Sequence, residues 1–266
     1  MQNSAKHLIA VLIGFTALTA SILIAKIYSA ETAAALSTAY TIGLSGILAA
    51  ICIIIAVKHQ KYRRYLLSLS MVMFCICFAE LYIGLYTLIK ETADTFIVTL
   101  PITEIAYLGS TAFIAALCAR IWHEEIPKNK INHGKTLLIS IAAALAFLII
   151  GRISISAGFT PVTVIPYAVF SAAAAWYSVK FFAAPKTAKP FLPLMTAITA
   201  YLAIDMLWTF IIPQIPGIAE GNISNIILAS LTLLQMLFIP ALIYAEEQSE
   251  KKAQENQNQK TLTEAP

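Results

Sequence analysis

Residues 66–88 read LLSLSMVMFCICFAELYIGLYTL, and this stretch decides the class of fold because Glu80 is its only charged residue. Each residue of an α-helix adds about 1.5 Å, so a helix of this length crosses the roughly 30 Å hydrocarbon core of a bilayer. A charge at that depth is costly and usually faces the interior of a helix bundle. The stretch therefore predicts a transmembrane helix that buries an acid.

Further apolar runs of similar length lie on both sides of this stretch. They occupy about Leu8–Tyr28, Ala33–Val57, Phe96–Trp122, Leu137–Ile155, Val162–Phe182, Phe191–Ile212 and Ile223–Tyr244. Breaks that contain lysine, proline or glycine separate all of these runs except the first two, as expected of loops. The predicted fold class is an all-α integral membrane protein, a bundle of about eight transmembrane helices.

The composition of the chain also favours a membrane protein. Of the 266 residues, 59% are hydrophobic and only 12% are charged, and the mean hydropathy is +0.78. A typical soluble domain is about 25% charged, so lipid must cover most of this surface. The net charge of +4 does not indicate nucleic-acid binding, because the basic residues lie in short breaks between apolar runs.

The basic residues are divided unequally between alternate breaks, which predicts the orientation. One set of segments holds Lys26, Lys90 and Arg152. The other set holds the remaining fifteen of the 18: Lys6, Lys58, Lys61, Arg63, Arg64, Arg120, Lys128, Lys130, Lys135, Lys180, Lys186, Lys189, Lys251, Lys252 and Lys260. Cytoplasmic segments carry the excess of Lys and Arg. Both ends of the chain are therefore expected on the cytoplasmic side of an inner or plasma membrane.

The two ends of the chain carry separate expectations. The first apolar run has the basic start of a signal peptide, but it is too long for one and Tyr28-Ser29-Ala30 is a poor cleavage site. A retained helix is therefore expected. Residues 246–266 are polar and lack aromatic side chains, so they are expected to extend the last helix briefly and then be disordered. The bundle itself is expected to occupy residues 1–245.

Short similarities recur in the same order in two halves of the chain, residues 1–125 and 130–247. The first and fifth apolar runs both follow a motif with asparagine, histidine and lysine, and Glu80 and Asp205 occupy matching places in the third and seventh. Each similarity is weak alone, but their order is preserved. The pattern predicts a 4+4 parallel repeat whose halves are related by an axis along the membrane normal.

Four charged residues fall inside the predicted spans at similar depth: Glu80, Glu104, Arg152 and Asp205. Counting about 1.5 Å per residue places them roughly 20 Å from the inner face. Polar residues at helical spacing extend these positions into stripes, which predicts a polar, acidic cavity in the outer half of the bundle. The candidate ligand-binding or ion-coupling residues are Glu80, Glu104, Arg152, Asp205, Tyr40, Tyr107, Tyr167, Tyr201, Asn225 and Gln235.

Two interpretations of the intramembrane charges stay open. In the first, the acids pair with Arg152 and with tyrosine hydroxyls only to hold helices together, although interhelical polar contacts contribute only about 0.6 kcal/mol each. In the second, they form a site for a ligand, an ion or a proton. Three acids against one arginine favour a cationic or zwitterionic solute, or a proton.

The motifs of enzymes are missing from the sequence, which contains no nucleotide loop, zinc-ligand set or nucleophile motif. All four cysteines lie within apolar runs: Cys52, Cys75, Cys77 and Cys118. They are expected to pack as small hydrophobic residues, and neither a metal site nor a cofactor is expected.

The favoured hypothesis is a small-solute transporter or permease. The alternative is a membrane-embedded ligand sensor or accessory subunit that signals to a cytoplasmic protein partner. Either protein has the lipid bilayer as its surroundings.

Overall fold

The computed structural model is all-helical in the part of the chain that it describes: residues 30–58, 60, 62–89, 96–126, 133–159, 161–184, 186–212, 215 and 222–263, and eight positions between residues 10 and 25. The main helices are α2 (Ala30–Lys58), α3 (Arg63–Ile89), α4 (Phe96–Glu125), α5 (His133–Ser156), α6 (Pro161–Ser178), α7 (Leu192–Met206) and α8 (Asn222–Thr263). Short 3₁₀ segments, η3 (Val179–Ala183) and η4 (Lys186–Phe191), connect α6 to α7.

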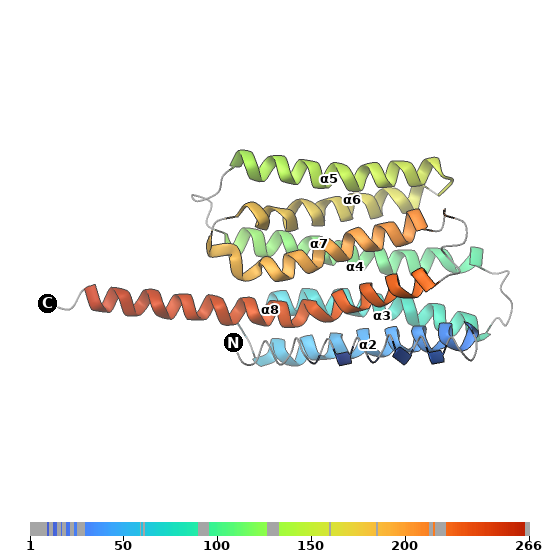
Figure 1. The fold of residues 1–266 in the computed structure, drawn as a ribbon, viewed down its shortest axis with the longest axis horizontal. Helices are drawn as coiled ribbons and strands as arrows, with labels where there is room; N and C mark the ends of the chain where they lie inside the picture. Colours follow the sequence, from blue (N-terminus) through green and yellow to red (C-terminus); the bar gives the residue numbers. More distant parts are fainter. Residues whose placement is uncertain are drawn as a thin grey trace.

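The helices run side by side along one direction, with α5 at one edge of the view and α2 at the other (Figure 1). Contacts link α2 with α3, α3 with α4, α4 with α6, α6 with α5, and α7 with both α6 and α8. The α4–α6 contact therefore joins the first half of the chain to the second. This pair of helices lies at the centre of the bundle and positions the candidate site.

One end of the bundle carries most of its basic residues. In Figure 1, α2, α4 and α6 finish at the end where α3, α5 and α7 begin, and α8 continues past it. We call this the basic end. The basic residues with described side chains at this end are Arg63, Arg64, Arg120, Lys135, Lys180, Lys189 and Lys251. The structure thus places at one end of the bundle the alternate segments that hold most of the basic residues in the sequence.

The outer helices expose apolar faces that water would not cover favourably. On α5, Leu138 is 70% exposed and Ile149 is 56% exposed, and Ile47 and Ile54 are similarly exposed on α2. Large contiguous apolar surfaces of this kind are rare on soluble monomers. Six helices of the described part are long and apolar enough to cross a membrane. The structure is therefore that of a helical, multi-pass membrane protein.

The predicted number of eight spans remains a prediction. Most of the first span lies outside the described residues, and so does Lys26. The last span corresponds to the beginning of α8, which continues as one helix to Thr263.

Helix α8 extends further than the brief extension expected from the composition of residues 246–266. Residues such as Glu247 and Lys251, four positions apart, favour helix in this segment.

Small residues let the central helices approach one another. Gly46 on α2 lies against the Cys77 sulfur, and Gly109 on α4 lies against the Cys75 sulfur. The two cysteines thus point from α3 toward different neighbours and fill the space that a glycine leaves. All four cysteines are free thiols. Among the described residues, no group of histidine, cysteine and acidic side chains has the arrangement of a metal site.

A close approach between α5 and α6 occurs at Gly151. A Cβ atom added at Gly151 would lie 2.6 Å from the Cβ atom of Ala168, far inside van der Waals contact. By contrast, a Cβ atom at Gly43 on α2 would meet nothing within 4 Å. Gly151 is therefore needed for helix packing, whereas Gly43 is not.

We expect Gly151→Ala to lower the thermal stability of the purified protein. The added methyl group must push α5 from α6, and overpacking of this kind costs about 1–3 kcal/mol. Gly43→Ala is the matched control, and it should leave stability unchanged or raise it by about 0.5–1 kcal/mol because alanine favours helix. Adding Ala168→Gly to the first variant should restore stability. Equal melting temperatures for the wild type, Gly151→Ala and Gly43→Ala would contradict the close contact between α5 and α6.

Candidate functional site

Two carboxyl groups, the buried one of Asp205 and the half-buried one of Glu80, each accept a hydrogen bond from a tyrosine of a neighbouring helix. The hydroxyl of Tyr107 on α4 donates a short hydrogen bond to the Oε1 atom of Glu80 on α3. The hydroxyl of Tyr167 on α6 donates a short hydrogen bond to the Oδ2 atom of Asp205 on α7. The two tyrosines come from the two central helices, and they reach outward to opposite neighbours.

Further contacts connect the two acid–tyrosine pairs. Thr111 on α4 donates a hydrogen bond through its hydroxyl to the backbone oxygen of Tyr107 at 2.9 Å, and its side chain also lies close to Tyr167. Tyr107 is close enough to Asp205 to interact with it electrostatically. The pairs are therefore parts of one polar cluster that crosses the α4–α6 contact.

Helices α7 and α8 contribute one more pair of side chains. Tyr201 lies one helical turn before Asp205, interacts with it electrostatically, and lies close to Gln235 of α8. The Oε1 atom of Gln235 is buried and has no hydrogen-bond partner. We call the whole set the acid–tyrosine network: Glu80, Tyr107, Thr111, Tyr167, Tyr201, Asp205 and Gln235. It joins α3, α4, α6, α7 and α8.

The network is buried on its Asp205 side and half-buried on its Glu80 side. Asp205 is 8% exposed, Tyr201 3% and Gln235 5%, whereas Glu80 and Tyr107 are half-buried. Tyr167 packs edge-on against Phe210, and Tyr201 packs in the same way against Phe238. The expected polar cavity open to one side stays a prediction.

The chemistry of the site follows from its hydrogen-bond donors. Those shown for Glu80 and Asp205 in the described part of the chain are neutral hydroxyls, not basic side chains. A hydroxyl donor satisfies one lone pair of a carboxylate without neutralising its charge, and an isolated buried charge is very costly. Such a carboxyl group is stabilised by a bound proton or cation. The network can therefore hold and release either one.

The structure leaves Arg152 outside the network. Its side chain is exposed on α5, and its Nη1 atom donates a hydrogen bond to Ser156 at 3.2 Å on the same helix. Gly151 faces α6, so the next residue points about 100° away around the helix. Sequence spacing predicts how deep a residue lies along a helix. It does not determine in which direction around the helix axis the side chain of Arg152 points.

Two other candidates also lie apart from these hydrogen bonds, and a third has no described side chain. Glu104 is half-buried on α4, three residues before Tyr107, and Tyr40 is half-buried on α2. The side chain of Asn225 lies outside the described residues. Glu80, Asp205, Tyr107, Tyr167, Tyr201 and Gln235 are therefore the candidate residues that the structure brings together.

Two structural features near the network have no clear signal in the sequence. Helix α7 ends at Met206 and continues as a π-helical turn, η5 (Leu207–Ile211), directly after Asp205. Turns of this type are rare and often occur at functional sites. Thr111, which lies beside the two central tyrosines, was visible in the sequence only as one member of a polar stripe on α4.

An aromatic cage lies at the basic end. The Lys180 ammonium group lies 4.7 Å from the ring centre of Tyr177, 4.8 Å from that of Trp176 and 5.3 Å from that of Trp122. Tryptophan, tyrosine and lysine concentrate at the level where a membrane meets water. The cage therefore marks the interface level at the basic end of the bundle.

No protein-family model matches this sequence, and no curated protein or solved structure matches it either.

We expect Tyr167→Phe and Tyr107→Phe to destabilise the protein because each leaves a buried or half-buried carboxyl group without its donor. The cost of such an unsatisfied group is about 1–3 kcal/mol. Tyr177→Phe is the control, since its ring contacts with His123 and Lys180 survive the loss of the hydroxyl. Thermal unfolding in detergent measures all three variants. If the first two proteins melt like the control, the tyrosine hydroxyls do not hold the carboxyl groups.

Proposed function

We propose that this protein is a small-solute transporter or permease in which the acid–tyrosine network binds a proton or the cationic group of the solute. The observation that carries this proposal is the arrangement of Glu80 and Asp205. Both acids are bound only through neutral hydroxyls in the described structure, and Thr111 lies beside both of their partner tyrosines. Buried acids without a basic partner are a poor means of joining helices but a suitable means of binding a positive charge.

Binding at these acids would change contacts between helices. A cation that binds Asp205 competes with the hydroxyl of Tyr167, which links α7 to α6. A cation that binds Glu80 competes in the same way with Tyr107, which links α3 to α4. Occupancy of the site is thereby coupled to the packing of the helices, as alternating access requires.

The π-helical turn after Asp205 gives α7 a place to bend. Its backbone departs from regular α-helical hydrogen bonding two residues beyond the acid. A local change there would move the segment beyond Asp205 without disturbing the buried first part of α7. In this proposal the two halves of the chain form a 4+4 parallel repeat, with the basic end in the cytoplasm.

The second candidate function is a ligand sensor or accessory subunit. The observation that favours it is α8, which leaves the bundle and continues to Thr263 as a single polar helix (Figure 1). Since Gln235 on the same helix belongs to the network, a change at the site would be passed along α8. A partner protein at the basic end would then receive the signal.

Transport by the purified protein in vesicles tests the proposal. The vesicles contain a pH-sensitive dye, and a panel of small amines and amino acids is added outside with and without a pH gradient. We expect uptake or proton movement with at least one solute. Asp205→Asn and Glu80→Gln should each lower the rate about tenfold or more, since a hydrogen bond to a charged group contributes about 1.5–3 kcal/mol.

Glu104→Gln is the matched control because it removes an acid of α4 that is outside the network. It should retain nearly the full rate, and all variants should still fold and enter vesicles. Full transport by both the Asp205 and the Glu80 variants would refute a charged transport site. A protein that moves no solute, yet copurifies with a stoichiometric partner that needs the segment after Glu246, would favour the sensor.

A further inference from the structure

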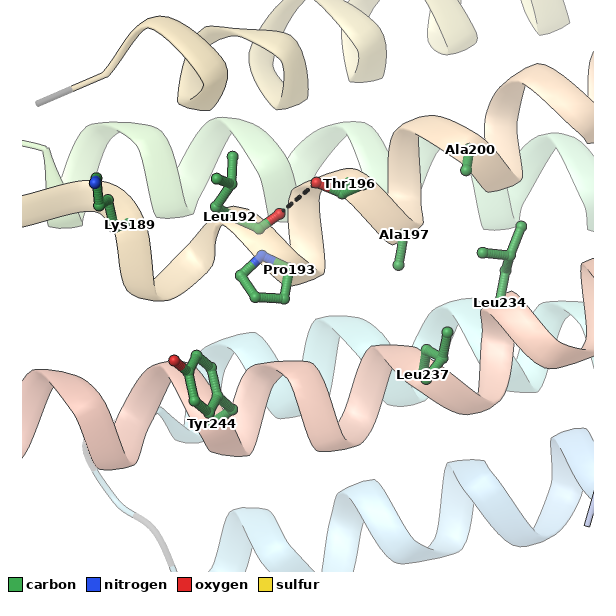
Figure 2. Close-up of a pocket in the computed structure, with 9 residues that line it drawn as sticks. All are labelled: Lys189, Leu192, Pro193, Thr196, Ala197, Ala200, Leu234, Leu237 and Tyr244. Atoms are coloured by element: carbon green, nitrogen blue, oxygen red, sulfur yellow. Dashed lines mark hydrogen bonds between the residues drawn. The ribbon is translucent and has the colours of Figure 1, made fainter. Parts of the chain in front are cut away.

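A groove lies between α7 and α8. Figure 2 shows side chains of both helices turned toward this space, with α4 and α3 behind it. The groove has a volume of about 520 Å³, which is within the range of sites for single small molecules. Its lining residues are Lys189, Leu192, Pro193, Thr196, Ala197, Ala200, Leu234, Leu237 and Tyr244.

The walls of the groove are apolar along most of their length. Thr196 is the one polar residue in the middle of the α7 wall, and its hydroxyl is directed to the backbone oxygen of Leu192 at 2.8 Å. Ala197 and Ala200 make the α7 wall shallow, whereas leucines form the α8 wall. Between Thr196 and the ends of the groove the walls are alanine, leucine and proline, so this surface suits a hydrocarbon chain.

One end of the groove has a different character. Lys189 and Tyr244 lie at the same end in Figure 2, and Ala200 and Leu234 lie toward the other. The lysine side chain is exposed and belongs to the basic end of the bundle. The groove therefore combines a positive charge at the interface level with an apolar interior.

The length of the groove matches one leaflet of a bilayer. On α8, Tyr244 lies ten residue steps after Leu234, or roughly 15 Å along the helix. On the α7 side, Ala200 lies eleven steps after Lys189, which gives a similar length. Half of a hydrocarbon core about 30 Å thick is also roughly 15 Å. A chain lying in the groove would reach from the interface to the middle of the membrane.

We infer that this groove binds one anionic phospholipid, with an acyl chain between α7 and α8 and the phosphate group at Lys189. Charge decides between this occupant and a zwitterionic or neutral lipid, because a basic residue at the interface attracts anionic headgroups. The volume of the groove argues against a second copy of the protein. At about 520 Å³, it has room for one acyl chain but not for the face of another helix.

The position of the groove gives the lipid an influence on the network. At its inner end, Ala200 precedes Tyr201 and Leu234 precedes Gln235, the pair that connects α7 to α8. An acyl chain between these helices sets their separation at that level. Lipid binding itself does not depend on the proposed transport activity, so the two proposals can fail separately.

Native mass spectrometry of the delipidated protein, titrated with phosphatidylglycerol or phosphatidylcholine, tests this inference. We expect the wild-type protein to bind phosphatidylglycerol about fivefold more tightly, as one basic residue at the interface provides. Lys189→Gln should remove this preference. Ala200→Leu should fill the inner end of the groove and weaken the binding of both lipids about fivefold or more, because it removes space for the chain.

The controls make equivalent changes elsewhere. Arg63→Gln removes one exposed charge at the basic end, and Ala142→Leu enlarges an exposed residue on the outer face of α5. Both should bind the two lipids like the wild type. The inference is overturned if Lys189→Gln keeps the preference or if Ala200→Leu binds both lipids unchanged. A wild-type dimer that Ala200→Leu dissociates would also overturn it, since a second copy would then occupy the groove.

Discussion

The hydrogen bonds from Tyr107 to Glu80 and from Tyr167 to Asp205 are the interactions on which the centre of this bundle depends. A carboxyl group among apolar helices is stable only where donors reach it. Here the donors come from α4 and α6, the helices that join the two halves of the chain. Each tyrosine fixes one outer helix against a central one, so the position of four helices is tied to the state of two acids.

The contacts around Asp205 extend further than those described for Glu80. Asp205 has a second tyrosine one turn away on its own helix, and Tyr201 carries the polar contacts on to Gln235 of α8. The same pair of helices borders the lipid groove, where Ala200 and Leu234 are the preceding residues. The α7–α8 contact is thus polar toward the network and apolar toward the membrane. A shift of α7 relative to α8 would alter both surfaces together.

The sequence predicts depth in the membrane much better than direction around a helix. Counting residues from the basic segments places Glu80 and Asp205 at one level, and the structure brings both into one cluster. The same count places Arg152 there, but its side chain points away from α6 because Gly151 occupies the contact. In helices that are apolar on every side, hydrophobic periodicity does not indicate which face is inside.

Other features arise only when distant segments meet. The groove requires small residues of α7 to lie opposite leucines of α8, and neither pattern is unusual alone. The π-helical turn follows Asp205 without a proline or glycine inside it to indicate its position. The helical continuation of α8 to Thr263 runs against the polar composition of that segment, which lacks any apolar face to bury.

Infrared difference spectroscopy of the protein in lipid vesicles measures the central claim most directly, because it detects protons on carboxyl groups. The account predicts a carboxylic-acid carbonyl band that disappears when the site exchanges its proton for methylammonium. That change should shrink in Glu80→Gln and in Asp205→Asn but remain in Glu104→Gln. A difference spectrum without any carboxylic-acid band, or one that both network variants leave unchanged, would contradict the account.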